Sequence, residues 1–95
     1  MPLALTLKIG DDFYVDRQQF VVEVVVPRES CVLREALTGK RFRIVSEHAT
    51  EIPPDVHVSA GERSTSTQYQ LVIAAPRDIP VVRGERYRNP FAGGK

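Results

Sequence analysis

The side chains best suited to acid–base or metal chemistry gather near the middle of the chain. This stretch holds both histidines of the protein and three carboxylates: Glu47, His48, Glu51, Asp55 and His57. A protein metal site needs three or four ligands that converge on one point. The spacing of these residues matches no recognised ligand pattern, and Pro53-Pro54 interrupts the stretch. We therefore expect no metal site here.

Cys31 is the only cysteine, so the chain cannot form an internal disulfide. A thiol and a histidine are the residue types of a cysteine nucleophile with its base, but the sequence around Cys31 matches no signature of that chemistry. The sequence also contains no glycine-rich phosphate-binding loop. These observations predict a protein that is not an enzyme and that carries no cofactor.

Arginines near the C-terminus offer a different chemistry. Arg83, Arg86 and Arg88 lie close together in sequence. A guanidinium presents a planar set of donors that suits a phosphate or the edge of a guanine. The alternative interpretation is structural, with Arg83 ending a strand and pairing at the surface with Asp78 or Glu85. Choosing between them depends on the elements that position Arg83.

The first third of the chain predicts a three-stranded meander. Residues 3–9 alternate apolar and polar side chains, which is the period of a half-buried strand. The strand pattern resumes at 13–15 and at 20–26, after short polar turns. The β-branched run 20–26 is expected to be covered on both faces except at Glu23. Pro27 ends it, because proline cannot donate to a ladder.

The rest of the chain predicts a mixture of elements. Residues 30–37 are compatible with one to two helical turns, with Ser30 as the N-cap and Gly39 just past the end. Four further segments predict strands: 42–45, 56–58, 69–74 and 79–82. The polar residues 61–67 predict an exposed loop, and any helix after Arg83 must be very short because Pro90 follows. No internal repeat is visible in the sequence.

Two segments at opposite ends of the chain carry a family resemblance. The first is Leu5-Thr6-Leu7-Lys8-Ile9-Gly10-Asp11-Asp12, and the second is Ala75-Pro76-Arg77-Asp78-Ile79-Pro80-Val81-Val82-Arg83. They resemble the Leu-Thr-Arg-Arg-Val-Gly-Glu start and the Ala-Pro-(basic)-(acidic)-(apolar)-x-Val-x-Arg segment of the carbon storage regulator (CsrA/RsmA) family of RNA-binding translational regulators. Residues 3–27 and 69–88 align, so the resemblance covers roughly half of the chain. Residues 28–68 have no counterpart, because the family has a short turn there.

The resemblance implies a fold and a partner. The expected fold is all-β, a small CsrA-like β-sheet or barrel formed as a strand-interleaved homodimer. Residues 1–88 would form one domain with an inserted hairpin or small lobe at about 28–68, and residues 89–95 a flexible tail. In the family, RNA lies along an edge formed by the first strand of one protomer and the last strand of the other. The RNA carries a GGA element, often in a hairpin loop that overlaps a ribosome-binding site.

Carried over residue by residue, the resemblance implies RNA contacts at six positions: Leu5, Thr6, Lys8, Ala75, Pro76 and Arg83. Lys8 keeps a positive charge where the family has an arginine, but it lacks the bidentate fork of a guanidinium. Leu7 replaces the other arginine of the family start. Leu5 is apolar and is expected to lie in the core rather than in contact with RNA.

Composition limits these interpretations. The net charge is +1 and 42% of the residues are hydrophobic, which argues against binding nucleic acid mainly through bulk electrostatics. The near-neutral charge, Leu7 and the lack of the family's C-terminal helix after Arg83 favour the alternative, a structural or protein-interaction module that has lost RNA binding on a CsrA-like scaffold. Residues 28–68 would then be the candidate surface for a protein partner. One cysteine and no long apolar run predict a cytoplasmic protein that does not associate with membranes.

Overall fold

The computed structural model describes residues 3–26, 29–53, 55–61, 65 and 68–88. These residues form nine strands and one short helix: β1 (Leu3–Leu7), β2 (Asp12–Val15), β3 (Gln18–Val26), β4 (Ser30–Glu35), β5 (Arg41–Val45), β6 (Thr50–Ile52), β7 (Val56–Ala60), β8 (Tyr69–Ala74), β9 (Val81–Arg83) and α1 (Gly84–Arg88). The expected brevity of the helix after Arg83 is confirmed, since α1 has five residues. No helix within the described ranges has the length and apolar character of a membrane span.

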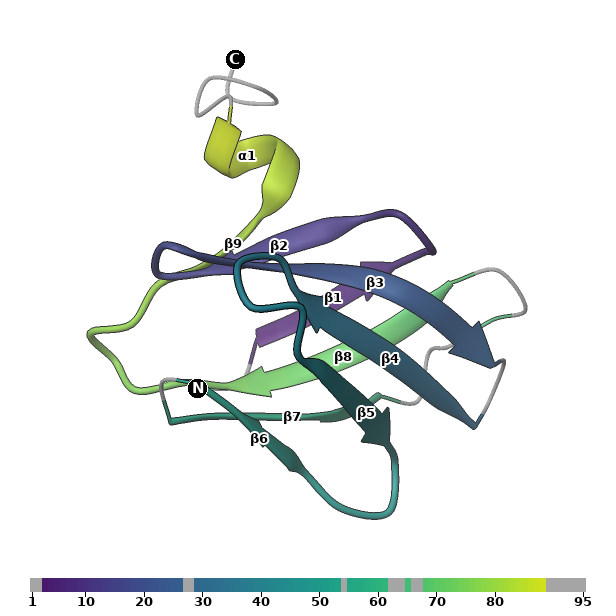
Figure 1. Ribbon diagram of the computed structural model, residues 1–95. Helices are drawn as coiled ribbons and strands as arrows, with labels where there is room; N and C mark the ends of the chain where they lie inside the picture. The colour runs from purple at the N-terminus through teal and green to yellow at the C-terminus, as the bar shows by residue number, and fades with distance from the viewer. Residues whose placement is uncertain (1–2, 27–28, 54, 62–64, 66–67, 89–95) are drawn as a thin grey trace.

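The strands form two antiparallel sheets that pack face to face (Figure 1). One sheet has four strands in the order β1-β8-β7-β6, and the other has five in the order β5-β4-β3-β2-β9. The expected all-β class is confirmed. The chain crosses between the sheets repeatedly, since β1 and β2 belong to different sheets, as do β5 and β6 and also β8 and β9.

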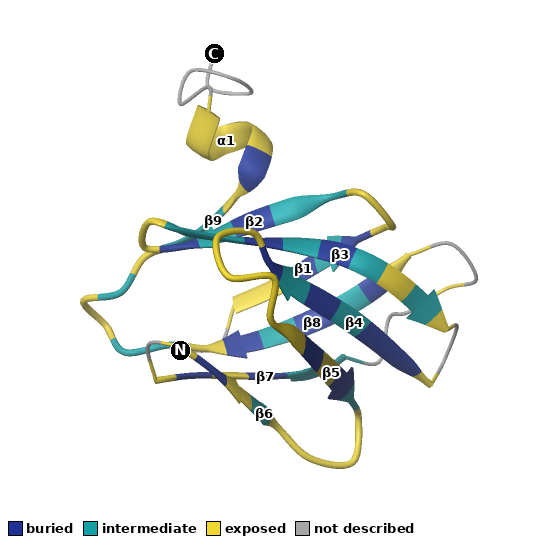
Figure 2. Cartoon of the chain, in the orientation of Figure 1, coloured by how far each residue is buried: buried dark blue, intermediate teal, exposed yellow. Residues whose placement is uncertain are grey.

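The core lies between the two sheets and follows the period-two pattern of the strands. About every second residue of a strand is buried, and Figure 2 shows this alternation of buried and more exposed residues along β4, β7 and β8. The largest fully buried side chains include Phe13, Phe20 and Leu33 from one sheet and Tyr69 and Leu71 from the other. Each such side chain stabilises the folded state by roughly 1.5–3 kcal/mol relative to its exposed form.

Two expectations about local structure are wrong. Residues 30–35 form strand β4 instead of helical turns, because burial alternates along them: Cys31, Leu33 and Glu35 are buried, whereas Val32 and Arg34 are partly exposed. Strand β3 is not covered on both faces along its whole length. The register shifts between Val22 and Val24, and beyond this bulge Val24 is 43% exposed.

The segment without a family counterpart forms four strands, two in each sheet. β4 and β5 extend the five-stranded sheet beyond β3, and β6 and β7 extend the four-stranded sheet beyond β8. The segment therefore contributes two hairpins, β4–β5 to one sheet and β6–β7 to the other, and its buried side chains belong to the shared core. Most of the expected loop at 61–67 and the whole expected tail at 89–95 lie outside the described residues.

The structure reveals an internal repeat that is not visible in the sequence. The two sheet orders are β1-β8-β7-β6 and β5-β4-β3-β2-β9. Exchanging β1 with β5, β2 with β6, β3 with β7 and β4 with β8 turns each order into the other. Strand β9 alone has no counterpart among the described residues.

The registers repeat as closely as the strand orders. Adding 37 to the residue numbers of β1 and β2, and 38 to those of β3 and β4, reproduces every strand pairing that both halves contain. For example, Leu5 lies opposite Leu71. Phe42, 37 positions after Leu5, correspondingly lies opposite Leu33, 38 positions before Leu71. Register is set by which side chains face the core, so each half places its core positions in the same way.

The number that relates the two halves changes from 37 to 38 at a hairpin turn, because this turn is one residue longer in the second half. Two residues connect β2 to β3, and three connect β6 to β7. Each turn contains an aspartate in the left-handed region, Asp16 with φ 56° and Asp55 with φ 81°. Aspartate tolerates this conformation better than most residues. The two turns are therefore versions of one structural feature.

Candidate nucleic-acid interface

The candidate site lies where an edge of one sheet meets an edge of the other. Strand β1 ends the four-stranded sheet and β9 ends the five-stranded sheet, and within the described ranges neither has a strand on its outer side. We call the surface formed by β1 (Leu3–Leu7) and β9 (Val81–Arg83) the β1/β9 seam. An unpaired edge leaves backbone N–H and C=O groups available to a ligand.

The two strands of the seam run in the same direction. Leu3 shares a pocket with Val81, and at the other end Leu7 shares one with Arg83 and Gly84. Between them lies an open groove of about 490 Å³ lined by both strands and by two residues of α1: Leu3, Ala4, Leu5, Val81, Val82, Arg83, Glu85 and Arg86. The first and last strands of the chain thus build one concave surface.

Arg83 spans this seam. Its Nη1 donates a hydrogen bond to the backbone carbonyl oxygen of Thr6, at 3.2 Å. The alternative interpretation is an ion pair of Arg83 with Asp78 or Glu85. The described part of the chain shows neither pair. The hydrogen bond to Thr6 uses one of the five N–H donors of the guanidinium. Arg83 is exposed, so its other N–H groups can donate to a ligand.

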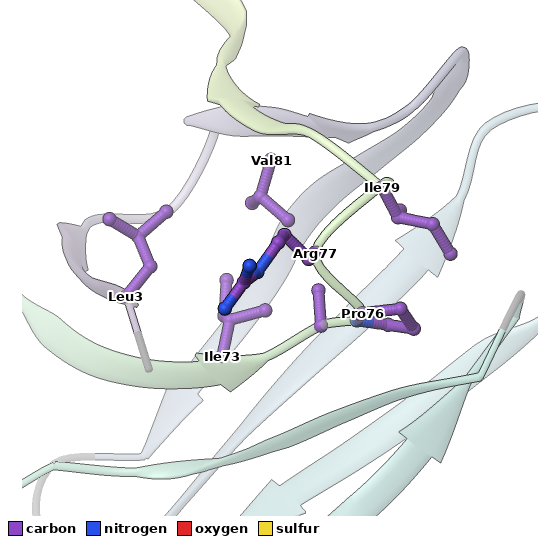
Figure 3. A pocket seen from close by; sticks show the side chains of 7 residues that line it. Leu3, Ile73, Pro76, Arg77, Ile79 and Val81 are labelled. Atoms are coloured by element: carbon purple, nitrogen blue, oxygen red, sulfur yellow. The ribbon is translucent and has the colours of Figure 1, made fainter. Parts of the chain in front are cut away.

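A second pocket, of about 290 Å³, continues the seam past the start of β1. It is lined mainly by apolar side chains from β1, β8, β9 and the connection between β8 and β9: Leu3, Ile73, Ala75, Pro76, Arg77, Ile79 and Val81. Figure 3 shows the side chain of Arg77 extending across this pocket between Val81 and Ile73. The pocket combines an apolar floor with a planar cation, which are the surfaces against which nucleobases stack.

The structure brings five of the six expected contact residues to this surface. Thr6 and Arg83 are hydrogen-bonded, and Ala75 and Pro76 line the second pocket. Leu5 lines the groove but is only 5% exposed, so it belongs to the core as expected.

Lys8 and Leu7 depart from the family pattern in different ways. Lys8 is exposed just beyond the end of β1, where its backbone N–H donates to the Asp11 carboxylate at 3.1 Å, and it lines neither pocket of the seam. Leu7 is 1% exposed and faces the core. The position at which the family start has its first arginine therefore cannot carry a charge toward solvent in this chain.

Helix α1 is held to β2 by contacts that the sequence did not reveal. Arg88 makes two hydrogen bonds to the Asp12 carboxylate, at 2.7 and 3.1 Å, and the rings of Tyr14 and Tyr87 stack with centroids 3.8 Å apart. Gly84 packs directly on the Asp12 carboxylate, where a larger residue would collide with it. These contacts fix the end of β9 and hence the position of Arg83.

The electrostatics of these contacts separate Arg88 from the other arginines. The hydrogen bond from Arg88 is the main cause of a lowered pKa at Asp12, opposed by burial and helped by a hydrogen bond from Gln19. Arg88 is thereby neutralised locally. Arg77, Arg83 and Arg86 are exposed around the seam, with the exposed carboxylate of Glu85 beside them in the groove. The residues that line the groove and the second pocket thus carry more positive than negative side chains, although the whole chain is nearly neutral.

The possible chemistry of the middle segment is weaker than that of the seam. Glu51 lies opposite His57 in the β6–β7 hairpin, and together with Asp55 they place ligand atoms within 4.8 Å of one another. Pro53-Pro54 interrupts this stretch in the sequence, whereas the hairpin brings the three side chains together. All three are exposed, and exposed carboxylates gather on protein surfaces without binding an ion.

Cys31 is unsuited to act as a nucleophile. Its side chain is buried in the core, and burial raises the pKa of the thiol to about 12. The reactive form of cysteine is the thiolate, which is essentially absent at neutral pH at this position.

Comparisons of the chain with family models, with curated proteins and with solved structures find no match. The residues of the seam and the resemblance of its two segments are therefore the observations that bear on function.

Proposed function

We propose that the protein is a sequence-selective RNA-binding regulator that acts after transcription, and that the β1/β9 seam is its RNA site. The observation that carries the proposal is the hydrogen bond from Arg83 to the Thr6 carbonyl across two unpaired sheet edges. The two segments that resemble the carbon storage regulator family lie far apart in sequence, and in the fold they form one surface.

The chemistry of the seam suits single-stranded RNA. Such RNA is read through unstacked bases, which are contacted by backbone groups, stacking surfaces and a few donors. The open edges of β1 and β9 offer the backbone groups, and the pocket beneath Arg77 offers an apolar surface for a base. Arg83 and Arg86 offer guanidinium donors for phosphate or for a guanine edge.

The proposed target follows from the resemblance. We expect the preferred element to be GGA in the loop of a hairpin, in the leader of an mRNA or in a small RNA. Occupying a leader near its ribosome-binding site would modulate translation. Because the net charge is only +1, affinity must come from local contacts, and binding should discriminate between sequences instead of following charge alone.

The test measures binding of fluorescent hairpins by anisotropy at a fixed, stated salt concentration. One hairpin carries GGA in its loop and the other carries a scrambled loop of the same composition. The wild-type protein is compared with Arg83→Ala and with a matched control, Arg43→Ala. Arg43 is an exposed arginine on β5, at the opposite edge of the sheet that ends in β9.

We expect the wild-type protein and Arg43→Ala to prefer the GGA hairpin, and Arg83→Ala to lose that preference. Equal weak binding to both hairpins, or an equal loss for the two arginine variants, would contradict it. That result would favour a protein-interaction module built on the same scaffold.

A further inference from the structure

We propose that one chain contains both halves of a strand-exchanged scaffold with approximate two-fold symmetry, and that it acts as a single-headed binder with one RNA site per chain. The number of RNA sites rests on the proposed function. The number of chains needed to complete the fold does not, because it follows from the strand pairings alone.

The two halves complete each other's sheets. The first strand of the first half, β1, pairs with β8 of the second half, and the first strand of the second half, β5, pairs with β4 of the first half. The first strand of each half therefore pairs within the sheet of the other half, and the two pairings have matching registers. Such exchange normally links two copies of a chain, whereas here both partners belong to one polypeptide.

Strand β9 breaks this symmetry. It follows β8 and pairs with the outer side of β2. In the first half, residues 36–40 lead directly from β4 to β5, with Gly39 in the left-handed region at φ 78°, so nothing equivalent to β9 is formed there. β6, which corresponds to β2, ends its sheet in the described part of the chain. The seam is therefore built once.

The place of a second seam is closed by the protein itself. The residue that corresponds to Thr6 in the second half is Arg43, 37 positions later. The Thr6 carbonyl accepts from Arg83 of β9, whereas the Arg43 carbonyl accepts from Thr50 Oγ1 of β6 at 2.8 Å. The backbone carbonyl of β5 that corresponds to the partner of Arg83 is thus bonded to a side chain of β6.

The connection between β1 and β2 favours closure within one chain. Residues 8–11 cross from one sheet to the other, and the turn is fixed by hydrogen bonds from Asp11 N to Lys8 O and from Gly10 N to Val22 O, both 2.9 Å. Passing β1 alone to a second copy, with β2 left in place, would require this short turn to open and both bonds to break.

The first experiment is a mass measurement by light scattering on the full chain, over a range of concentrations, with and without the GGA hairpin. We expect the mass of one chain alone and of one chain with one hairpin at saturation. A two-chain particle without RNA, or two hairpins on one chain, would overturn the inference.

The second experiment asks directly whether β1 pairs within its own chain. Ala4 and Val72 are opposite each other on the outer face of β1 and β8. Ala4→Cys with Val72→Cys, in a Cys31→Ala background, should oxidise to a bond within one chain that runs as a monomer on a non-reducing gel. The two single-cysteine variants, mixed in equal amounts, give the background of random bonds between chains.

The outcomes separate the two proposals. Covalent dimers well above that background would show β1 exchanged between chains and would overturn this inference. A one-chain mass with no hairpin bound would contradict the proposed function and leave the closed two-half scaffold supported. Binding of the GGA hairpin by a two-chain particle would support the proposed function and overturn the inference that one chain completes the fold.

Discussion

The guanidinium of Arg83 lies 3.2 Å from the carbonyl oxygen of Thr6, although 77 positions separate the two residues in sequence. This contact joins the last strand of one sheet to the first strand of the other. It holds the arginine against an unpaired backbone edge before any ligand is present. A side chain ordered in advance loses less entropy on binding.

Arg83→Lys is predicted to bind the GGA hairpin more weakly than the wild type and more tightly than Arg83→Ala. Lysine keeps the charge but cannot make a bidentate contact. Losing a bidentate base contact costs roughly 1–3 kcal/mol. Anisotropy titrations at several salt concentrations test this, because the lysine variant should keep the salt dependence of the wild type. Equal affinities for lysine and arginine would show that only charge matters at this position.

Leu7→Arg is predicted to unfold the protein instead of improving RNA binding. The substitution restores the residue of the family start, yet Leu7 is buried, and burying an unpaired charge is costly. The reference variant is Leu7→Ala, for which truncation of a buried leucine costs about 2–5 kcal/mol. Urea unfolding followed by circular dichroism measures both. A stable Leu7→Arg protein with higher RNA affinity would mean that β1 turns its other face to the core.

The contact between Asp12 and Arg88 is predicted to make stability fall in acid. The pKa of Asp12 is lowered in the folded state, so the contact stabilises the protein fully above the unfolded carboxyl pKa of about 3.9. That stabilisation is lost as the pH falls through the lower, folded pKa. The excess unfolding free energy of the wild type over Asp12→Asn should therefore be present at pH 7 and shrink toward zero in strong acid.

The stacked tyrosines give a local signal for the same region. Near-ultraviolet circular dichroism should report the Tyr14–Tyr87 stack in the wild type and lose part of that signal in Asp12→Asn and in Gly84→Ala. Gly84→Ala acts by pushing a methyl group into the Asp12 carboxylate. An unchanged spectrum in both variants would show that α1 does not depend on Asp12.

Cys31 is predicted to resist thiol reagents in the folded protein. Its pKa is raised to about 12 and its side chain is buried. Labelling at neutral pH should be slow without denaturant and rapid above the unfolding midpoint, when followed by absorbance with a chromogenic disulfide reagent. Rapid, complete labelling of the folded protein would contradict the assigned core position.

Strand periodicity predicted much of the fold but missed the two-half architecture. Alternation located the strands around Leu5, Phe42 and Leu71, because one face of each sheet is buried and the other is not. The repeat stayed hidden because it preserves burial and register but not residue identity. Leu7 corresponds to Ile44, for example, and the sequence pattern of a strand does not name its partner strand.

The candidate site was predicted in part. The resemblance identified Thr6, Ala75, Pro76 and Arg83, and the fold brings them to one surface. The position of Arg77 across the second pocket was not predicted, because it depends on the path of the chain between β8 and β9. The docking of α1 through Asp12 was also missed, since pairing between residues so distant in sequence follows from the tertiary fold.

The most direct test of the RNA site is a titration of uniformly ¹⁵N-labelled protein with the GGA hairpin, followed by amide chemical shifts. We expect large shifts in β1, in residues 75–83 and at the start of α1, and small shifts in β5 and β6, where the second half has no counterpart of the seam. Shifts concentrated in β5 and β6, or spread evenly over the surface, would contradict the assignment of the β1/β9 seam as the RNA site.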